Sequence, residues 1–201
     1  MFPLVETIKI LNGEICNLLY HQRRLEYSFE VYFKEKTFYL LQDVITIPKE
    51  FSKGLVKLRF LYAKKDYKLE FFYYTPHKIN ILKVIENNKI DYLLKFTDRS
   101  QINRLLKQKG DCDDILIVKN GFITDTSIAN IVFYNGNEWV TPATPLLKGT
   151  CRDKLLKEGK IKEEIIKIND LHKFKSFCLI NAMLCGDLLP IPIKNIAGHI
   201  L

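Results

Sequence analysis

Residues 124 to 152 place an acid, small polar residues and a glycine-threonine pair in an order that could bind a charged cofactor. Asp125 is followed by Asn130, then by Thr141-Pro142, and Gly149-Thr150 opens a predicted helix. The order predicts a buried carboxylate near the backbone N–H groups of a helix N-terminus, which bind phosphate well. Such a site suits a cofactor that carries both a basic ring nitrogen and a phosphate.

The composition indicates a globular chain. Of 201 residues, 47% are apolar and 12% are aromatic, which is enough to build a core and argues against disorder. No apolar run reaches the ~18 residues that span a bilayer, and the N-terminus lacks the pattern of a secretory signal. We therefore expect a cytoplasmic protein that does not bind a membrane.

The cysteines and the charge argue against a disulfide framework, a metal site and nucleic-acid binding. Five cysteines are an odd number without a C-x-x-C pair, so neither a disulfide framework nor a metal site is predicted, and reduced thiols are expected. The net charge of +8 comes mostly from lysines that alternate with acids. This pattern favours a solvated surface over nucleic-acid binding, although a modest positive field could attract a small anionic substrate.

The spacing of apolar residues and turn signals predicts a mixture of helices and strands. Asn12-Gly13 is a strong hairpin signal after the first strand, and Thr75-Pro76-His77 marks a domain boundary. Strands are predicted over 3–11, 55–63, 67–74, 79–85, 115–119, 128–134 and 177–180, and helices over 18–33, 36–44, 100–108 and 149–156.

The acid, Thr-Pro and Gly-Thr order resembles fold-type IV pyridoxal-phosphate enzymes, which include branched-chain and D-amino-acid aminotransferases and aminodeoxychorismate lyases. Their usual form is a Glu, small residues and Asn, then Thr-Pro, then Leu-x-Gly-Ile-Thr-Arg. Here Asp125 replaces the Glu, and Thr150-Cys151 replaces Ile-Thr. The resemblance implies an α+β (mixed α/β) fold of two small lobes, residues 1–75 and 76–201, with pyridoxal 5'-phosphate in a cleft between them.

The same resemblance assigns Lys95 as the catalytic lysine that forms a Schiff base with the cofactor. Lys95 precedes Asp125 by 30 residues, and the pattern from Lys95 to Arg99 looks like the Lys-x-x-[Asn/Asp]-Arg form of aminodeoxychorismate lyases. Its apolar neighbours would desolvate the amine and lower its pKa. Considered alone, any one of 25 lysines would be a weak candidate for this role.

The cofactor-binding residues follow from the resemblance in the same way. Asp125 would keep the pyridine nitrogen protonated, although an Asp-Thr-Ser run also favours a turn. Arg24 in His-x-x-Arg-Leu would bind the phosphate, although the motif alone also fits a basic helix surface. The main-chain amides of Thr150 and Cys151 would bind the phosphate too. None of the four histidines shows metal-ligand spacing, and Asn130 is expected to fix a loop.

Two segments bear on the reaction. Residues 180–184 (Ile-Asn-Ala-Met-Leu) and Arg99 resemble aminodeoxychorismate lyases more than transaminases. The implied reaction converts 4-amino-4-deoxychorismate to 4-aminobenzoate and pyruvate in folate synthesis. Two alternatives remain open: an aminotransferase acting on branched-chain or D-amino acids, and an inactive cofactor-binding relative.

The resemblance runs from Leu4 to about Pro192. Family members usually carry an extra strand and loop before the segment that matches residues 2–8, so an N-terminal lobe shortened at its start is expected. Because fold-type IV sites are usually completed near a subunit interface, the resemblance also implies a homodimer.

Overall fold

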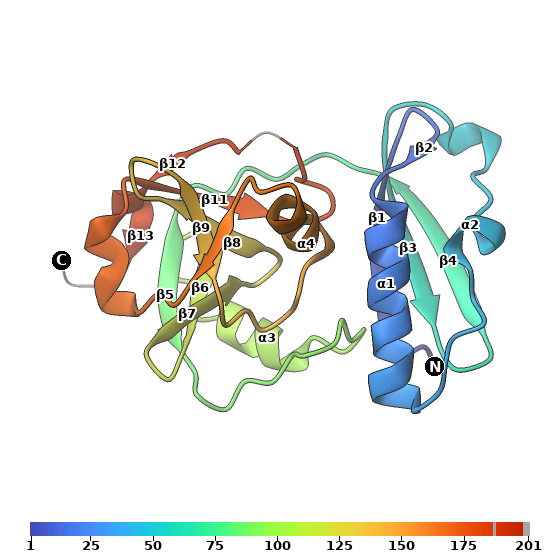
Figure 1. The fold of residues 1–201 in the computed structure, drawn as a ribbon, viewed down its shortest axis with the longest axis horizontal. Helices are drawn as coiled ribbons and strands as arrows, with labels where there is room; N and C mark the ends of the chain where they lie inside the picture. The colour runs from blue at the N-terminus through green and yellow to red at the C-terminus, as the bar shows by residue number, and fades with distance from the viewer. Residues whose placement is uncertain (187, 199–201) are drawn as a thin grey trace. The chain divides into compact units, whose positions relative to one another are not determined.

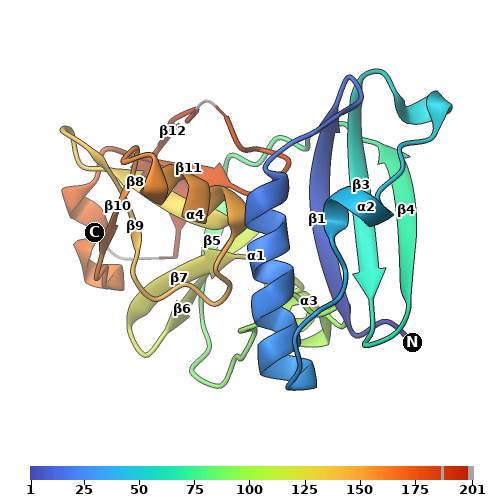
Figure 2. The same ribbon diagram turned by 45° about the vertical axis from the view of Figure 1, so that its right-hand side comes forward.

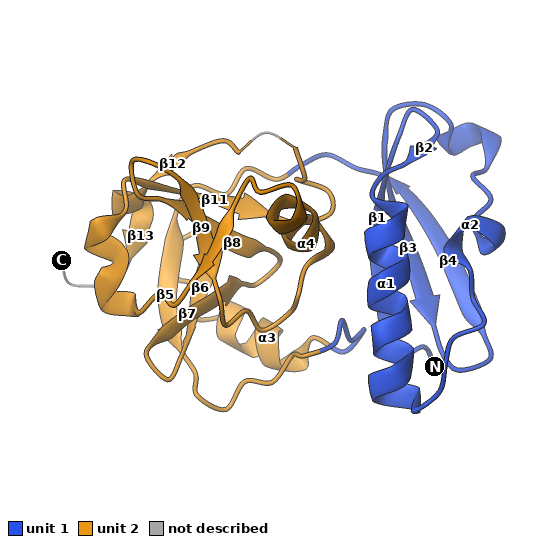
Figure 3. Cartoon of the chain, in the orientation of Figure 1, with its two compact units in different colours: residues 1–76, 94–98 blue, residues 77–93, 99–201 orange. Residues whose placement is uncertain are grey.

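The structure, a computed structural model, describes residues 1–186 and 188–198. The chain forms two compact units (Figure 3). Unit 1 contains Met1–Pro76 and Leu94–Asp98, and unit 2 contains His77–Leu93 and Arg99–Leu201. The sequence placed residues 76–201 in one lobe together with Lys95, whereas in the structure Lys95 lies in the short segment that belongs to unit 1.

Unit 1 is a four-stranded antiparallel sheet with the strand order β2-β1-β3-β4. A helix lies beside the sheet, and a π-helical segment, η1, follows directly after its last residue (Figure 1). The elements are β1 (Leu4–Leu11), β2 (Glu14–Ile15), α1 (Leu18–Ser28), η1 (Phe29–Phe33), α2 (Leu41–Val44), η2 (Lys49–Phe51), β3 (Leu55–Tyr62) and β4 (Tyr67–Tyr73).

Alternation along the strands of unit 1 explains how α1 packs. Leu4, Ile8 and Ile10 on β1 are fully buried, and so are the alternate residues of β3. Side chains of alternate strand residues share one face of a sheet. Leu25 and Phe29 join these residues in a single apolar cluster, so α1 and η1 cover this face (Figure 2). Any polar side chain on the same face of β1 is therefore buried against α1.

The Asn12-Gly13 turn between β1 and β2 forms as the sequence predicts. Asn12 has a φ of 50° and Gly13 a φ of 83°, the left-handed values that a tight hairpin turn requires. Glycine and asparagine tolerate this region better than other residues. The predicted strand over 3–11 and the hairpin of 55–63 with 67–74 are also confirmed.

The helix predicted over 36–44 is shorter in the structure, where α2 covers only Leu41–Val44. The side chain of Gln22 on α1 explains the difference. Its amide donates to the carbonyl of Tyr39 at 3.1 Å and accepts from the backbone N–H of Leu41 at 2.9 Å. The two bonds lie on either side of Leu40, whose backbone is extended, and α2 begins only after it.

Unit 2 is built on a nine-stranded mixed sheet (Figure 1). Its main path runs β10-β9-β8-β7-β6-β5-β13, and β11 pairs with both β8 and β12. The elements are β5 (Leu82–Glu86), α3 (Ser100–Leu106), β6 (Asp114–Lys119), β7 (Phe122–Thr126), β8 (Asn130–Tyr134), β9 (Trp139–Pro142), α4 (Thr150–Lys157), β10 (Lys162–Glu164), η3 (Ile168–Lys173), β11 (Ser176–Ile180), β12 (Ile191–Pro192), η4 (Ile193–Asn195) and β13 (Ile196–Ala197).

Apolar clusters hold the described part of unit 2 together. One of them joins β5–β9, β11 and β13, with Phe133 and Phe177 among its fully buried members. A smaller one fixes α4 against β8 and β11 through Cys151, Leu155 and Val132. The start of α4 is thereby held close to the strands that carry the acid motif. Within the described part of the chain, none of the helices has the length and apolar character needed to cross a membrane.

Candidate active site

Asp125 lies within a strand, one residue before its end. It belongs to β7 and pairs with Asn130 of β8, and only 5% of the residue is exposed. One carboxylate oxygen accepts a hydrogen bond from Asn130 Nδ2 at 2.7 Å, and the other accepts from the backbone N–H of Leu147 at 2.9 Å. The alternative of a turn residue is therefore wrong. Burial raises the pKa of Asp125 to about 6, although these hydrogen bonds and Arg152 oppose the rise.

Asn130 connects the acid to the loop before α4. Its side-chain amide also donates to the carbonyl of Leu147 at 2.8 Å, so it fixes that loop, as the sequence predicted. Gly149 follows in the same loop. A Cβ atom on Gly149 would lie 2.0 Å from Oδ1 of Asn130, far inside contact distance. Glycine is therefore required at this position for the loop to approach β8.

Thr150 and Cys151 form the first turn of α4, with Gly149 as its N-cap. Both residues are buried. Helices begin with N–H groups that no carbonyl of the same helix accepts, and such a terminus favours a phosphate. The sequence thus placed these two residues correctly at a helix start that follows the acid motif.

The prediction of reduced thiols is wrong at two positions. Cys151 and Cys185 form a disulfide with a Cα–Cα distance of 5.5 Å, whereas Cys16, Cys112 and Cys178 are free. The partners are 34 residues apart in the chain, so no short motif links them. They meet because α4 and the loop after β11 pack on the same apolar cluster.

Lys95 lies in the short segment Leu94–Asp98, which belongs to unit 1. Its carbonyl accepts from the N–H of Val5 at 3.0 Å, and Leu4 pairs with Phe96 in an antiparallel bridge. The Thr97 hydroxyl donates to the carbonyl of Phe2 at 2.7 Å. The segment therefore lines the same edge of β1 as β2, because β3 occupies the other edge.

Arg24 lies on α1 and binds a carboxylate that the sequence did not single out. Its Nε donates to Glu6 Oε1 at 2.8 Å, and its Nη2 donates to Glu6 Oε2 at 2.6 Å. His21 Nδ1 lies 2.6 Å from the same Oε2. Glu6 and His21 are fully buried, and 11% of the Arg24 side chain is exposed.

The charges of this cluster follow from its burial and its contacts. Burial alone would raise the pKa of Glu6, but Arg24 and the bond from His21 lower it to about 2. Burial lowers the pKa of His21, and the positive charges of Arg24 and Lys95 act in the same direction, although Glu6 opposes them. At neutral pH the cluster thus holds a carboxylate, a guanidinium and a neutral imidazole that donates from Nδ1.

Arg99 and Asn181, which belong to the two segments that resemble the lyases, both bind one turn of unit 2. Arg99 Nη2 donates to the carbonyl of Ser127 at 2.5 Å. Asn181 Nδ2 donates to the carbonyl of Ile128 at 3.3 Å, and its Oδ1 accepts from Leu184 N at 3.0 Å. Both side chains therefore hold the β7–β8 turn, which starts two residues after Asp125.

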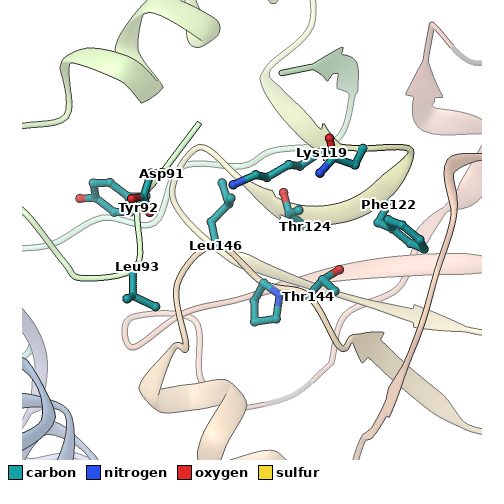
Figure 4. A pocket seen from close by; sticks show the side chains of 10 residues that line it. Asp91, Tyr92, Leu93, Lys119, Phe122, Thr124, Thr144 and Leu146 are labelled. Atoms are coloured by element: carbon teal, nitrogen blue, oxygen red, sulfur yellow. The ribbon is translucent and has the colours of Figure 1, made fainter. Parts of the chain in front are cut away.

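Unit 2 contains a pocket of about 310 Å³, and none of the predicted site residues lines it. Figure 4 shows Lys119 and Thr124 among the side chains that line it, with Tyr92 and Leu146. Asp125, Thr150 and Cys151 are not among its lining residues. Asp125 neighbours Thr124 on β7 and thus points to the opposite face of the strand. No group of three or more candidate metal ligands occurs among the described residues.

Comparison with known proteins identifies relatives along nearly the whole chain. Residues 93–192 match the family model of amino-transferase class IV. A crystal structure from Haemophilus somnus 129pt, provisionally named 4-amino-4-deoxychorismate lyase, is 40% identical, with a TM-score of 0.85 over 91% of this chain and 97% of that one. An uncharacterized protein of Haemophilus influenzae is 40% identical over 91% of this chain and 98% of its own length. A protein of Schizosaccharomyces pombe, provisionally named aminodeoxychorismate lyase, is 35% identical over 35% of this chain and 33% of its own.

Proposed function

The chain belongs to the class IV aminotransferase family, and we propose that it is a lyase that converts 4-amino-4-deoxychorismate to 4-aminobenzoate and pyruvate. Class IV aminotransferases depend on pyridoxal phosphate. The observation that carries the proposal is the placement of Asp125: a buried carboxylate bonded to Asn130 and to the loop that opens α4. Two relatives with provisional lyase names support the choice of reaction.

The residues present fit pyridoxal phosphate chemically. Asn130 and Leu147 each donate a hydrogen bond to the carboxylate of Asp125, and an ionised carboxylate offers about four acceptor positions. The carboxylate can therefore accept the N–H of a protonated ring. Gly149 lets the start of α4 approach β8, and the Arg24 guanidinium is a donor suited to phosphate. The acid, the helix start and the arginine thus match a ring nitrogen and a phosphate.

When bound, pyridoxal phosphate supplies an aldehyde that joins to amines and a ring that accepts electrons. Lys95 would hold the group through that aldehyde, and its amine would serve as the base for the ring proton of the substrate and as the acid that returns a proton to the departing enolpyruvate, which becomes pyruvate. Asp125 would accept a hydrogen bond from the ring nitrogen and keep that nitrogen protonated. Arg24 and the amides of Thr150 and Cys151 would bind the phosphate.

The turn held by Arg99 and Asn181 favours the lyase over a transaminase. These two residues carry the lyase resemblance, and their side chains fix Ser127 and Ile128 beside the strand of Asp125. A turn that is fixed by two side chains presents one constant surface beside the strand of Asp125. The proposal therefore assigns Arg99 and Asn181 a positioning role in the lyase reaction.

The direct test incubates the purified protein with 4-amino-4-deoxychorismate and measures 4-aminobenzoate and pyruvate. We expect equal amounts of both products, and no conversion of amino acids to keto acids in parallel incubations. Transamination without 4-aminobenzoate would replace the lyase with the aminotransferase. Uptake of pyridoxal phosphate with neither reaction would instead indicate the inactive cofactor-binding relative, and failure to take up pyridoxal phosphate would contradict the cofactor assignment itself.

A lysine variant tests the catalytic assignment. Lys95→Ala should abolish turnover and the visible absorption of the bound cofactor, because the amine that joins the aldehyde is removed. The matched control is Lys65→Ala, at an exposed lysine in the turn between β3 and β4, which should retain both. Borohydride reduction followed by peptide mass mapping should place the cofactor on Lys95. Attachment to a different lysine would contradict the assignment.

A further inference from the structure

The cluster of Glu6, His21 and Arg24 has a feature that phosphate binding alone does not require. Glu6 is fully buried on β1, and both of its oxygens are bound to the Arg24 guanidinium through Nε and Nη2. We propose that Glu6 is a positioning residue, which fixes the plane of Arg24 so that this arginine can bind the phosphate of the cofactor. The inference rests on the proposed function, because it assumes that Arg24 binds phosphate.

The geometry of the ion pair supports a fixed guanidinium plane. Two parallel N–H···O bonds to one carboxylate define the plane and the direction of a guanidinium, whereas a single bond leaves rotation open. Two of its five N–H donors bind Glu6, and a guanidinium can bind acceptors along more than one edge. Glu6 thus sets the direction of the other edges of the guanidinium.

The position of Glu6 in the sheet makes this orientation rigid. Glu6 lies on the face of β1 that also carries Leu4 and Ile8, both fully buried beneath α1. Its backbone is paired with Phe60 of β3. Since α1 carries Arg24 and His21 on its buried side, the carboxylate links the helix to the sheet at two points. Arg24 is therefore held by the buried face of the unit 1 sheet.

His21 completes the support of Glu6. Its Nδ1 lies 2.6 Å from Glu6 Oε2, which also accepts from Arg24. A neutral imidazole that donates from Nδ1 holds the carboxylate in place and adds no charge. Glu6 and Arg24 then balance each other inside unit 1. The incoming phosphate therefore meets an arginine whose orientation is set before binding, which limits the entropy lost on binding.

The test compares two forms of the cofactor that differ only in the phosphate. Dissociation constants are measured for pyridoxal 5'-phosphate and for pyridoxal with each purified variant. Both compounds carry the same aldehyde and ring, so the ratio of the two constants isolates the phosphate contribution. We expect Arg24→Ala to reduce the preference for the phosphorylated form tenfold to a hundredfold, on the order of the loss of a charged hydrogen bond.

Glu6→Ala should reduce the same preference about tenfold, because Arg24 would lose its fixed plane. Glu6→Gln should cause a smaller loss, since glutamine keeps one acceptor oxygen, and it provides a milder variant if the alanine variant does not fold. The double variant Arg24→Ala/Glu6→Ala should show the same preference for the phosphorylated form as Arg24→Ala alone, because Glu6 acts on the phosphate only through Arg24. The matched control is Glu70→Gln, which alters a second Glu–Arg pair of unit 1, with Arg59, and should leave the preference unchanged.

The outcomes separate this inference from the proposed function. A purely structural Glu6 would lower the melting temperature and weaken both compounds equally, with an unchanged ratio. If Arg24→Ala lowers the ratio but both Glu6 variants leave it unchanged, the positioning role is wrong and the phosphate role of Arg24 stands. If Arg24→Ala leaves the ratio unchanged, the phosphate assignment itself is wrong, and the positioning role with it.

Discussion

Asp125 is a carboxylate that the cofactor-free protein stabilises poorly. Burial raises its pKa from 3.8 to about 6, and the hydrogen bonds from Leu147 and Asn130 offset only part of this cost. A protonated ring nitrogen beside Asp125 would supply the missing positive partner. The pairing would favour the ionised carboxylate and the protonated ring together, which is the state the chemistry requires.

The raised pKa predicts how stability depends on pH in the absence of cofactor. Between pH 3.8 and about 6 the folded state binds more protons at Asp125 than the unfolded state does, so stability falls as pH rises through this range. Asp125→Asn removes the titration. Relative to wild type, the variant should therefore gain on the order of 1 kcal/mol in the free energy of unfolding from about pH 5 to about pH 7.5.

Urea unfolding of the cofactor-free proteins at the two pH values measures this difference. Asp111→Asn, at an exposed position in unit 2, is the control and should track the wild type. With cofactor present, Asp125→Asn should still bind but turn over slowly, because the ring would lose its charge. A difference between variant and wild type that stays constant with pH would show that Asp125 titrates normally.

At this scale the sequence reveals residues that belong to a local motif and misses those that act across the fold. Asp125, Gly149 and Thr150 are found because the acid, the glycine and the helix start follow one another in the chain. Glu6 lies inside the strand predicted over 3–11 and was not singled out as a site residue. Its role depends on contacts with His21 and Arg24, 15 and 18 residues away, which exist only once β1 packs against α1.

Among the elements, α4 is fixed at its first turn by a covalent bond. The disulfide between Cys151 and Cys185 ties α4 to the loop after β11, the same loop in which Asn181 holds the β7–β8 turn. The start of α4 and the β7–β8 turn are thus both attached to the loop after β11. If that loop moved, the backbone amides proposed to bind the phosphate and the turn beside Asp125 would both shift with it.

Reducing this disulfide should lower the stability of the protein. Closing a loop of 34 residues constrains the unfolded chain, and by the chain-entropy relation the bond contributes about 3 to 4 kcal/mol. Urea unfolding with and without a thiol reductant measures the loss. Cys151→Ser should show the same loss without reductant, whereas Cys16→Ser, at a free cysteine, should not.

Counting the thiols of the denatured, unreduced protein checks the bond independently. The structure predicts that Cys16, Cys112 and Cys178 react and that the remaining two cysteines do not. Reaction of all five would contradict the bond.

Prediction of the elements succeeds where local signals agree and fails where distant contacts decide. The Asn12-Gly13 turn and the hairpin of β3 and β4 follow from turn residues and alternation. The helix predicted over 36–44 is shortened because Gln22 bonds the backbone of Tyr39 and Leu41. The strand β7 was not predicted, because Thr-Asp-Thr-Ser has the composition of a turn and becomes a strand only through its pairing with β6 and β8.

For the whole molecule, the formal net charge of +8 bears on encounter with the substrate. A positive field raises the local concentration of anions, and salt screens it over about 8 Å at physiological ionic strength. The proposed substrate carries carboxylates. Its KM should therefore rise several-fold from low salt to high salt, whereas kcat should change little.

Steady-state kinetics over a series of sodium chloride concentrations measures the effect on KM. A neutral osmolyte at matched osmolality is the control and should leave KM unchanged. A KM that does not vary with salt would mean that the lysines are balanced locally by their acidic neighbours and create no net field for the substrate.

The first residues of the chain have a practical bearing on how the protein is produced. The carbonyls of Phe2 and Pro3 and the N–H of Val5 bond directly to the segment that carries Lys95. A purification tag fused to Met1 would add residues next to these hydrogen bonds, and one of the bonds is made by Lys95, the proposed reactive lysine. Expression vectors for spectroscopic work should therefore carry a cleavable tag, and its removal should be verified before the cofactor is titrated.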